Sequence, residues 1–142
     1  MPLANQQALI DAPADKVWAM MREKIERPDK YVPGVVEVEI VNRFDDGVVE
    51  RVMLARGEAG DKRIHEIISA SDATRTVVFL LKDDPAFFGF ITNTVFETDA
   101  GTVLDYTVNW TPRSEAAAKD ASDIAAMIRG AVQHAKELAE AG

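Results

Sequence analysis

Residues 16–40, KVWAMMREKIERPDKYVPGVVEVEI, change from a helical to a strand-like pattern within a few positions. Apolar residues in the first half recur at helical spacing and form one stripe, which predicts an amphipathic helix. That stripe consists of Val17, Trp18, Met21 and Ile25. A short helix that leads directly into a strand is the feature that decides the fold.

Two prolines separate this helix from the strand. Pro28 stops the helix, and the PDKY segment (28–31) predicts one further turn. Pro33-Gly34 marks a second break. Beyond it, VVEVEIVNRF (35–44) alternates with a period of two, which is typical of a half-buried strand. Chain reversals at these prolines let short helices cover one end of a curved sheet before the chain returns to the sheet as a strand.

The rest of the chain predicts more strands. Residues 3–11 form a first strand, and Pro13 stands where a proline is tolerated, near a helix start. Five later strand-like runs cover residues 48–56, 62–69, 75–82, 88–98 and 102–112. Consecutive strands joined by short turns predict an antiparallel meander. Between two of them, GEAGDK (57–62) is expected to be a surface loop rather than a phosphate-binding loop.

The hydrophobic pattern sets a register for the last hairpin. A three-residue loop, Asp99-Ala100-Gly101, pairs Phe96 with Leu104, Thr94 with Tyr106, Thr92 with Val108 and Phe90 with Trp110. A one-residue slip would flip every side chain, so we adopt the register that puts the large apolar residues on one face. It directs Phe90, Phe96, Tyr106, Val108 and Trp110 inward, and Asn93, Asp105 and Asn109 outward.

The same reasoning leaves the 36–56 hairpin open. A two-residue loop at Asp46-Gly47 places Arg51 and Met53 inside the sheet. A three-residue loop places Val52 and Leu54 inside instead. The sequence favours neither.

The C-terminal segment predicts one long helix. Ser114 is a good N-cap, and the helix should run for about 26 residues, or roughly 39 Å at the usual rise per residue. Its apolar stripe is rich in alanine, which is consistent with close packing on a sheet or with room for a ligand. The stripe consists of Ala117, Ala121, Ile124, Ile128, Ala131, Ala135 and Leu138.

The order of these elements resembles the helix-grip fold of the SRPBCC (START-like, Bet v 1-like) superfamily along essentially the whole chain. Within it, VWAMMREKIERPDKYVPGV (17–35) resembles the Trp-containing helix, Arg-Pro turn and Val-Pro entry of the AtaL-like family. ITNTVFE (91–97) and LDYTVNWTPR (104–113) resemble its later strand motifs. The expected fold is α+β: a seven-stranded curved antiparallel sheet wrapped on a long C-terminal helix, with two short helices after strand 1, in one domain spanning residues 1–142.

The resemblance implies an elongated cavity between the sheet and the long helix, and binding of a hydrophobic or amphipathic small molecule. Some superfamily members are polyketide aromatases, cyclases or dehydratases, and others carry lipids or hormones. Fold alone does not choose among these functions. The alternatives are a binding protein, a cofactor-free cyclase-like enzyme, and a structural or regulatory protein with a filled core.

Composition excludes several other classes. The formal net charge of −8 argues against a nucleic-acid phosphate footprint and disfavours docking on an anionic membrane. The chain has no cysteine, so disulfides and thiolate chemistry are absent. Residues 1–10 show no signal peptide, and no apolar run reaches the ~20 residues that span a bilayer. We expect a cytoplasmic protein without membrane insertion or nucleic-acid partners.

Metal and serine chemistry are poorly supported. His65 and His134 show no metal-ligand spacing, so we expect no metal and no cofactor. His65 and Glu66 are adjacent on one strand and point to opposite faces, so they cannot form a simple dyad. The serines lie in turns or in the helix, and no G-x-S-x-G motif is present.

Polar residues on strands are the better candidates for chemistry. If Arg51 faces inward, it offers a fixed cation to a carboxylate or an enolate. Glu66 would pair with it or act as a general base, and Tyr106 offers a hydroxyl donor. The competing interpretations are a surface ion pair between Arg51 and Glu66, and a Tyr106 that only packs in the core.

Two further expectations concern apolar surfaces. Phe87 and Phe88, in the segment 82–90, either form a lid or a homodimer patch beside the cavity mouth, or cap the core as an aromatic pair. The ligand-binding residues expected from the predicted register and the helix stripe are Phe90, Thr92, Phe96, Tyr106, Val108, Trp110, Ile124, Met127, Ile128 and Ala131.

Overall fold

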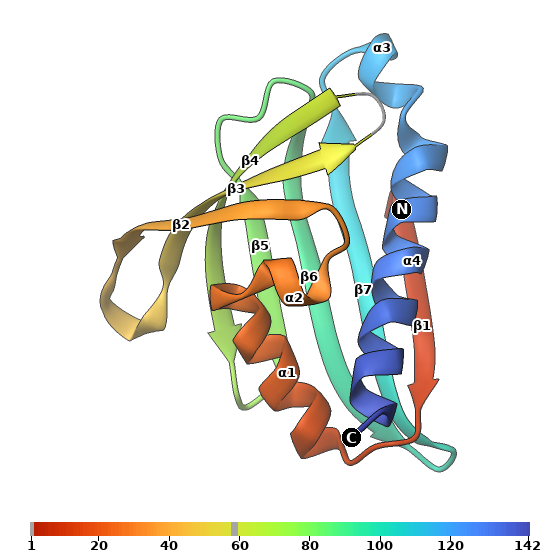
Figure 1. Cartoon of the computed structure of the whole chain (residues 1–142). Helices are drawn as coiled ribbons and strands as arrows, with labels where there is room; N and C mark the ends of the chain where they lie inside the picture. Colours follow the sequence, from red (N-terminus) through yellow and green to blue (C-terminus); the bar gives the residue numbers. More distant parts are fainter. Residues whose placement is uncertain (1, 58–59) are drawn as a thin grey trace.

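The computed structural model describes residues 2–57 and 60–142. A single antiparallel sheet holds seven strands in the order β1-β7-β6-β5-β4-β3-β2 (Figure 1). The strands are β1 (Ala4–Ile10), β2 (Val35–Arg43), β3 (Val49–Gly57), β4 (Gly60–Ser71), β5 (Thr76–Leu81), β6 (Phe87–Thr98) and β7 (Gly101–Pro112). The predicted meander is confirmed, and β1 closes it by pairing with β7.

Two short helices follow β1, as predicted. Helix α1 (Ala14–Glu26) begins directly after Pro13, and α2 (Pro28–Tyr31) has a proline at its first position. Pro28 has no amide hydrogen to continue α1, so the chain turns at Arg27. The two helices lie against one face of the sheet, which we call the inner face (Figure 1).

The C-terminal segment forms two helices rather than the single long one that was predicted. They are α3 (Glu115–Ala118) and α4 (Ala121–Glu140). The amides of Lys119 and Asp120 bond only three residues back, and this tighter turn redirects the chain. The N-cap is confirmed, because the Ser114 hydroxyl accepts a hydrogen bond from the Ala117 amide at 3.1 Å.

Helix α4 runs along β1 and β7 on the inner face (Figure 1). Small residues, Ala131, Ala135 and Ala139, are buried on the side that packs, which allows a close approach to the sheet. Helices α1 and α4 and the inner face enclose the core (Figure 1). The predicted helix-grip architecture is therefore confirmed.

The predicted register of the last hairpin is wrong. The structure has a two-residue turn, Asp99-Ala100, and Thr98 pairs with Gly101. Phe96 therefore lies opposite Val103, and Phe90 lies opposite Asn109. The orientation of β7 was correct, but every side chain of β6 is flipped.

As a result, Ile91, Asn93 and Val95 face inward from β6. Phe90 and Phe96 are each 38% exposed on the outer face. The prediction failed because β6 carries large apolar residues on both faces, so the pattern alone does not fix its register. The buried Asn93 side chain accepts a hydrogen bond from Lys24 of α1.

The open question at the 36–56 hairpin is resolved. Arg43 pairs with Val49, and a loop of residues 44–48 joins the strands. Register shifts occur between Val35 and Glu37 and between Ile40 and Asn42. Arg51 and Met53 are buried on the inner face, as the shorter of the two proposed loops implied.

Three smaller expectations have mixed outcomes. Phe87 is buried against Trp110, with ring centroids 5.3 Å apart, whereas Phe88 is 48% exposed, so they do not act as a pair. Of the predicted loop 57–62, Gly57 and residues 60–62 belong to β3 and β4, and residues 58–59 lie outside the described part of the chain. Within that described part, no helix is long and apolar enough to cross a membrane.

Candidate functional site

A small cavity lies between the inner face of the sheet and helices α1 and α4. It holds about 100 Å³, and its walls are mainly apolar. The apolar walls include Val35, Met53, Ile64, Phe79, Ile91 and Ile128. Side chains with polar atoms join them: Lys24 from α1, Arg51 from β3, Glu66 from β4, Asn93 from β6, and Tyr106 and Trp110 from β7.

Arg51 and Glu66 form a buried ion pair. Arg51 Nη2 donates to Glu66 Oε1 at 2.7 Å, and the side chains are 1% and 4% exposed. Arg51 Nη1 also donates to the backbone oxygens of Lys24 and Ile25, at 3.1 and 3.0 Å. The guanidinium thus ties β3 to the end of α1. The prediction of a surface ion pair is wrong, and the inward-facing alternative is correct.

Lys24 is the second cation in the cavity. Its Nζ donates to Asn93 Oδ1 at 2.6 Å and lies 4.2 Å from the centroid of the Tyr106 ring. Burial is the main reason that the pKa of Lys24 is lowered from 10.5 to about 7. Repulsion from Arg51 lowers the pKa further, and attraction to Glu66 opposes both effects.

Tyr106 is buried beneath these groups. Its hydroxyl lies 3.5 Å from Met21 Sδ, which is a weak acceptor. Burial raises the pKa of the Tyr106 hydroxyl, so it stays protonated at neutral pH. The predicted inward direction of Tyr106 is confirmed.

Three buried nitrogen donors, each on a residue that lines the cavity, lack an acceptor among the described residues. They are Arg51 Nε, Asn93 Nδ2 and Trp110 Nε1. A buried donor without an acceptor costs about 1–3 kcal/mol, so three on one cavity wall are unusual. The arrangement offers hydrogen bonds to oxygen atoms placed within the cavity.

The predicted ligand-binding residues fall into three groups. Tyr106, Trp110, Met127, Ile128 and Ala131 line the cavity. Val108 and Ile124 are buried in the core nearby. Phe90, Thr92 and Phe96 lie on the outer face of β6, which removes them from the cavity.

Sequence reasoning missed Lys24 and Asn93. Lys24 follows Val17 by seven residues and Met21 by three, so it lies on the apolar stripe of α1. A lysine on such a stripe was the available signal. Asn93 was assigned to the wrong face by the register error.

A second polar cluster lies on the outer face, at the same level of the sheet. Glu50 accepts hydrogen bonds from Asn42 Nδ2 and Lys82 Nζ, both at 2.9 Å. His65 Nε2 lies 2.6 Å from Glu50 Oε2. These bonds lower the pKa of Glu50 to about 2. His65 and Glu66 point to opposite faces, as predicted.

The other histidine is unremarkable in its contacts, since His134 Nε2 lies 3.1 Å from the backbone oxygen of Lys30. Among the residues that the structure describes, no three histidine, cysteine, aspartate or glutamate side chains gather as a metal site would require.

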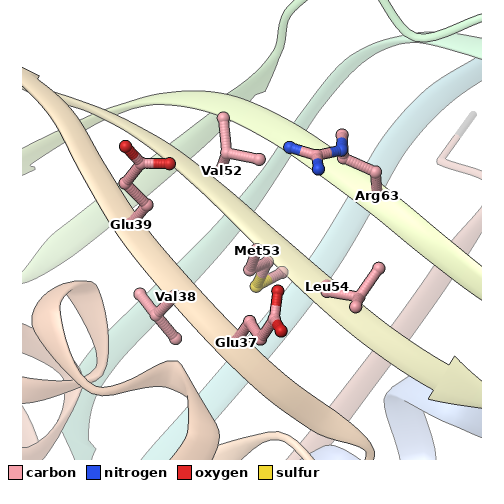
Figure 2. Close-up of a pocket in the computed structure, with 7 residues that line it drawn as sticks. All are labelled: Glu37, Val38, Glu39, Val52, Met53, Leu54 and Arg63. Carbon is pink, nitrogen blue, oxygen red and sulfur yellow. The ribbon is translucent and has the colours of Figure 1, made fainter.

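Another hollow, of about 360 Å³, lies over β2, β3 and β4 (Figure 2). It is lined by Glu37, Val38, Glu39, Val52, Met53, Leu54 and Arg63. Its charged residues are exposed to solvent, which weakens their interactions. None of the three unpaired donors belongs to its lining, so the inner cavity is the better candidate site.

Solved structures share this fold. The di-domain ARO/CYC StfQ from the steffimycin biosynthetic pathway is 15% identical with a TM-score of 0.79; the match covers 96% of this chain and 50% of StfQ. Ara h 8.0201 is 15% identical with a TM-score of 0.75, over 97% of both chains. The Zhui aromatase/cyclase from Streptomyces sp. R1128 is 16% identical with a TM-score of 0.69, over 98% of this chain and 96% of that one.

At such low identities, these structural matches support the fold alone. The chain spans about half the length of StfQ. A comparison with curated proteins finds no match. A family model described as AtaL, Acetylaranotin biosynthesis cluster protein L, matches residues 4–141. The resemblance drawn from the sequence is thereby confirmed, and the chain belongs to the AtaL family.

Proposed function

We propose that this protein binds a small amphipathic molecule in the cavity between the inner face of the sheet and the helices. One observation carries the proposal: Arg51, Asn93 and Trp110 line the same cavity, and each carries a buried nitrogen donor, Nε, Nδ2 or Nε1, without an acceptor among the described residues. A ligand with acceptor oxygens would satisfy these donors and would recover the free energy that their burial costs.

The cavity walls define the rest of the ligand. They combine an apolar surface, which includes Phe79 and Ile128, with Lys24 and Arg51 against the single carboxylate of Glu66. The polar end of the ligand is therefore a carboxylate, an enolate or a carbonyl, and the other end is hydrocarbon.

Size restricts the ligand further. Pockets for drug-sized ligands span roughly 300–1,000 Å³, whereas this cavity holds about 100 Å³. A ligand of a few heavy atoms fits without rearrangement. A longer one requires movement of the wall formed by Val32, Pro33 and the 48% exposed Met127.

The second candidate function is a cofactor-free cyclase or dehydratase acting on a polyketide-like substrate. Arg51, Glu66 and Tyr106 line one cavity, which favours this alternative. Two of the similar structures are named as aromatase/cyclases. Turnover of a poly-β-ketone model substrate, lost in Tyr106→Phe, which removes only a hydroxyl, would distinguish an enzyme from a binding protein.

Two measurements test the binding proposal. Native mass spectrometry of freshly purified protein should reveal a co-purifying small molecule. Calorimetric titration with butyrate, which has an acceptor head and a short hydrocarbon tail, should show saturable binding.

A matched pair of tryptophan variants locates that binding. Trp110→Phe removes an unpaired donor but keeps an aromatic ring, and should weaken butyrate binding about tenfold. Trp18→Phe is the control, because Trp18 Nε1 donates to Asp72 Oδ1 at 2.9 Å. Absence of saturable binding would contradict the proposal and support a protein with a filled core.

A further inference from the structure

Lys24 is a buried lysine without a carboxylate partner among the described residues. Its side chain is buried on the cavity wall, and the nearby Glu66 is already engaged by Arg51. The only polar atom that Lys24 Nζ contacts there is the amide oxygen of Asn93. An unpaired buried ammonium is costly, which favours the neutral amine.

The surroundings of Lys24 bear this out. Burial and the Arg51 guanidinium together lower the pKa of Lys24 to about 7, so about half of the protein carries a neutral amine at pH 7. A neutral lysine amine in an apolar pocket beside another cation is an activated nucleophile. Few lysines on a protein surface share this property.

An oxygen site accompanies the amine. Asn93 binds Lys24 Nζ through Oδ1, while Nδ2 of the same amide has no acceptor among the described residues. Arg51 lines the same cavity, and its buried Nε also lacks an acceptor there. A carbonyl group placed here presents its carbon to the amine and its oxygen to two donors, which would stabilise negative charge on that oxygen.

From this arrangement we infer that Lys24 forms an imine with a small aldehyde or ketone that enters the cavity. The inference rests on the proposed binding function and specifies the ligand class as a carbonyl compound. Neutral Lys24 Nζ adds to the carbonyl carbon, and the proton that the nitrogen loses passes to the carbonyl oxygen to give a carbinolamine. A proton from solvent then joins the hydroxyl, the carbon–oxygen bond breaks, water leaves, and a protonated imine with a carbon–nitrogen double bond remains.

Aromatic rings around Nζ suit the product. The Tyr106 and Phe79 ring centroids lie 4.2 and 5.1 Å from Nζ. A protonated imine carries its positive charge where the ammonium stood, so both rings stabilise it by cation–π attraction. The volume of about 100 Å³ limits the carbonyl compound to a small one unless the cavity widens.

The test uses acetone as the probe and cyanoborohydride as an added reductant, which delivers hydride to the imine carbon and fixes an isopropyl group on nitrogen. Peptide mapping after labelling at pH 7 compares Lys24 with the exposed Lys119 of the same molecule. Because the surroundings of Lys24 activate its amine, Lys24 should be labelled at least about tenfold faster.

The pH profile adds a second readout. Labelling of Lys24 should rise through pH 7 and then level off. The titratable and charged groups that face Lys24 are Arg51 on β3, Glu66 on β4 and Tyr106 on β7. Equal labelling of Lys24 and Lys119 at pH 7 would overturn the inference.

Butyrate binding, measured on the same sample, separates two kinds of failure. If butyrate binds and Lys24 is not preferentially labelled, the imine inference fails and the binding function stands. If neither occurs, both fail. Lys24→Arg keeps a cation but removes the nucleophile, so it should abolish the labelling that wild type shows at this position and leave labelling of Lys119 unchanged.

Discussion

Strands β3 and β4 carry two polar clusters back to back, and the two differ in how completely their hydrogen bonds are satisfied. On the outer face, Glu50 accepts bonds from Asn42 and Lys82 and contacts His65. On the inner face, the neighbouring Arg51 binds Glu66 but leaves Nε without an acceptor among the described residues.

This difference in hydrogen bonding suggests a structural role for the outer cluster and a binding role for the inner one. Three partners hold the outer carboxylate, so it has little left to offer a ligand. The inner cluster has surplus donors and a surplus cation, Lys24, around a cavity. Because unsatisfied buried groups cost stability, their retention on one wall points to binding there.

The largest expected effect is on the inner ion pair. Arg51→Met leaves the Glu66 carboxylate buried without its partner and should destabilise the protein by about 3–5 kcal/mol. Urea denaturation measures this loss. The double variant Arg51→Met/Glu66→Met removes both charges and should recover most of it. A single variant that costs less than about 1 kcal/mol would contradict the burial of the pair.

Lys24 should make stability depend on pH. The pKa of Lys24 is about 7 in the folded protein and ordinarily 10.5, so the unfolded chain binds more protons between these pH values. The free energy of unfolding should therefore rise with pH across this window, by at most about 1.4 kcal/mol per pH unit.

The control for that slope is Lys24→Met, which lacks the titrating amine. The difference in unfolding free energy between wild type and this variant should change steadily from pH 7 to pH 9.5. Parallel pH profiles would show that the Lys24 amine titrates normally in the folded state.

A substitution that fills the cavity should abolish ligand binding and change the stability of the protein only slightly. Ala131 is 5% exposed and lines the cavity, so Ala131→Leu adds hydrocarbon into about 100 Å³ of space. We expect loss of butyrate binding with a stability change below about 1.5 kcal/mol. Tryptophan at this position adds more volume than the cavity holds. Unchanged butyrate binding in Ala131→Leu would place the ligand elsewhere.

The smallest effect should come from the outer cluster. Bonds to Asn42, Lys82 and His65 hold the pKa of Glu50 at about 2, below its ordinary value of 4.5. The stability that these bonds add is present above pH 4.5 and is lost as pH falls toward 2. The gap in thermal stability between wild type and Glu50→Gln should thus narrow over that range, with butyrate binding at pH 7 unchanged. A gap that stays constant would contradict the assigned pKa.

Periodicity and proline placement predicted the fold because each local signal agreed with the whole. Each of three local patterns allowed only one structure: the apolar stripe of α1, the helix end at Pro28 and the alternation after Gly34. The register of β6 failed, since Phe90 and Phe96 on one face compete with Phe87, Ile91 and Val95 on the other.

The site was harder to predict for a related reason. The predicted register directed Asn93 outward, and Lys24 was not counted on the apolar stripe of α1. The structure joins the two in the cavity by one hydrogen bond between distant segments. No local pattern encodes such a pair. The break at Lys119 and Asp120 was missed as well, because both residues are compatible with a helix and only the three-residue bonds show the turn.

The central claim is that the unpaired donors of the inner cavity bind ligand oxygen, and the two indole N–H signals test it directly. Trp110 lines the cavity and its buried Nε1 has no acceptor among the described residues, whereas Trp18 Nε1 is bonded to Asp72. In ¹H–¹⁵N spectra recorded during a butyrate titration, the Trp110 signal should shift saturably while the Trp18 signal stays in place. Butylammonium, with the opposite charge, should shift neither. A Trp110 signal that does not move with butyrate, or moves equally with both probes, would contradict the account.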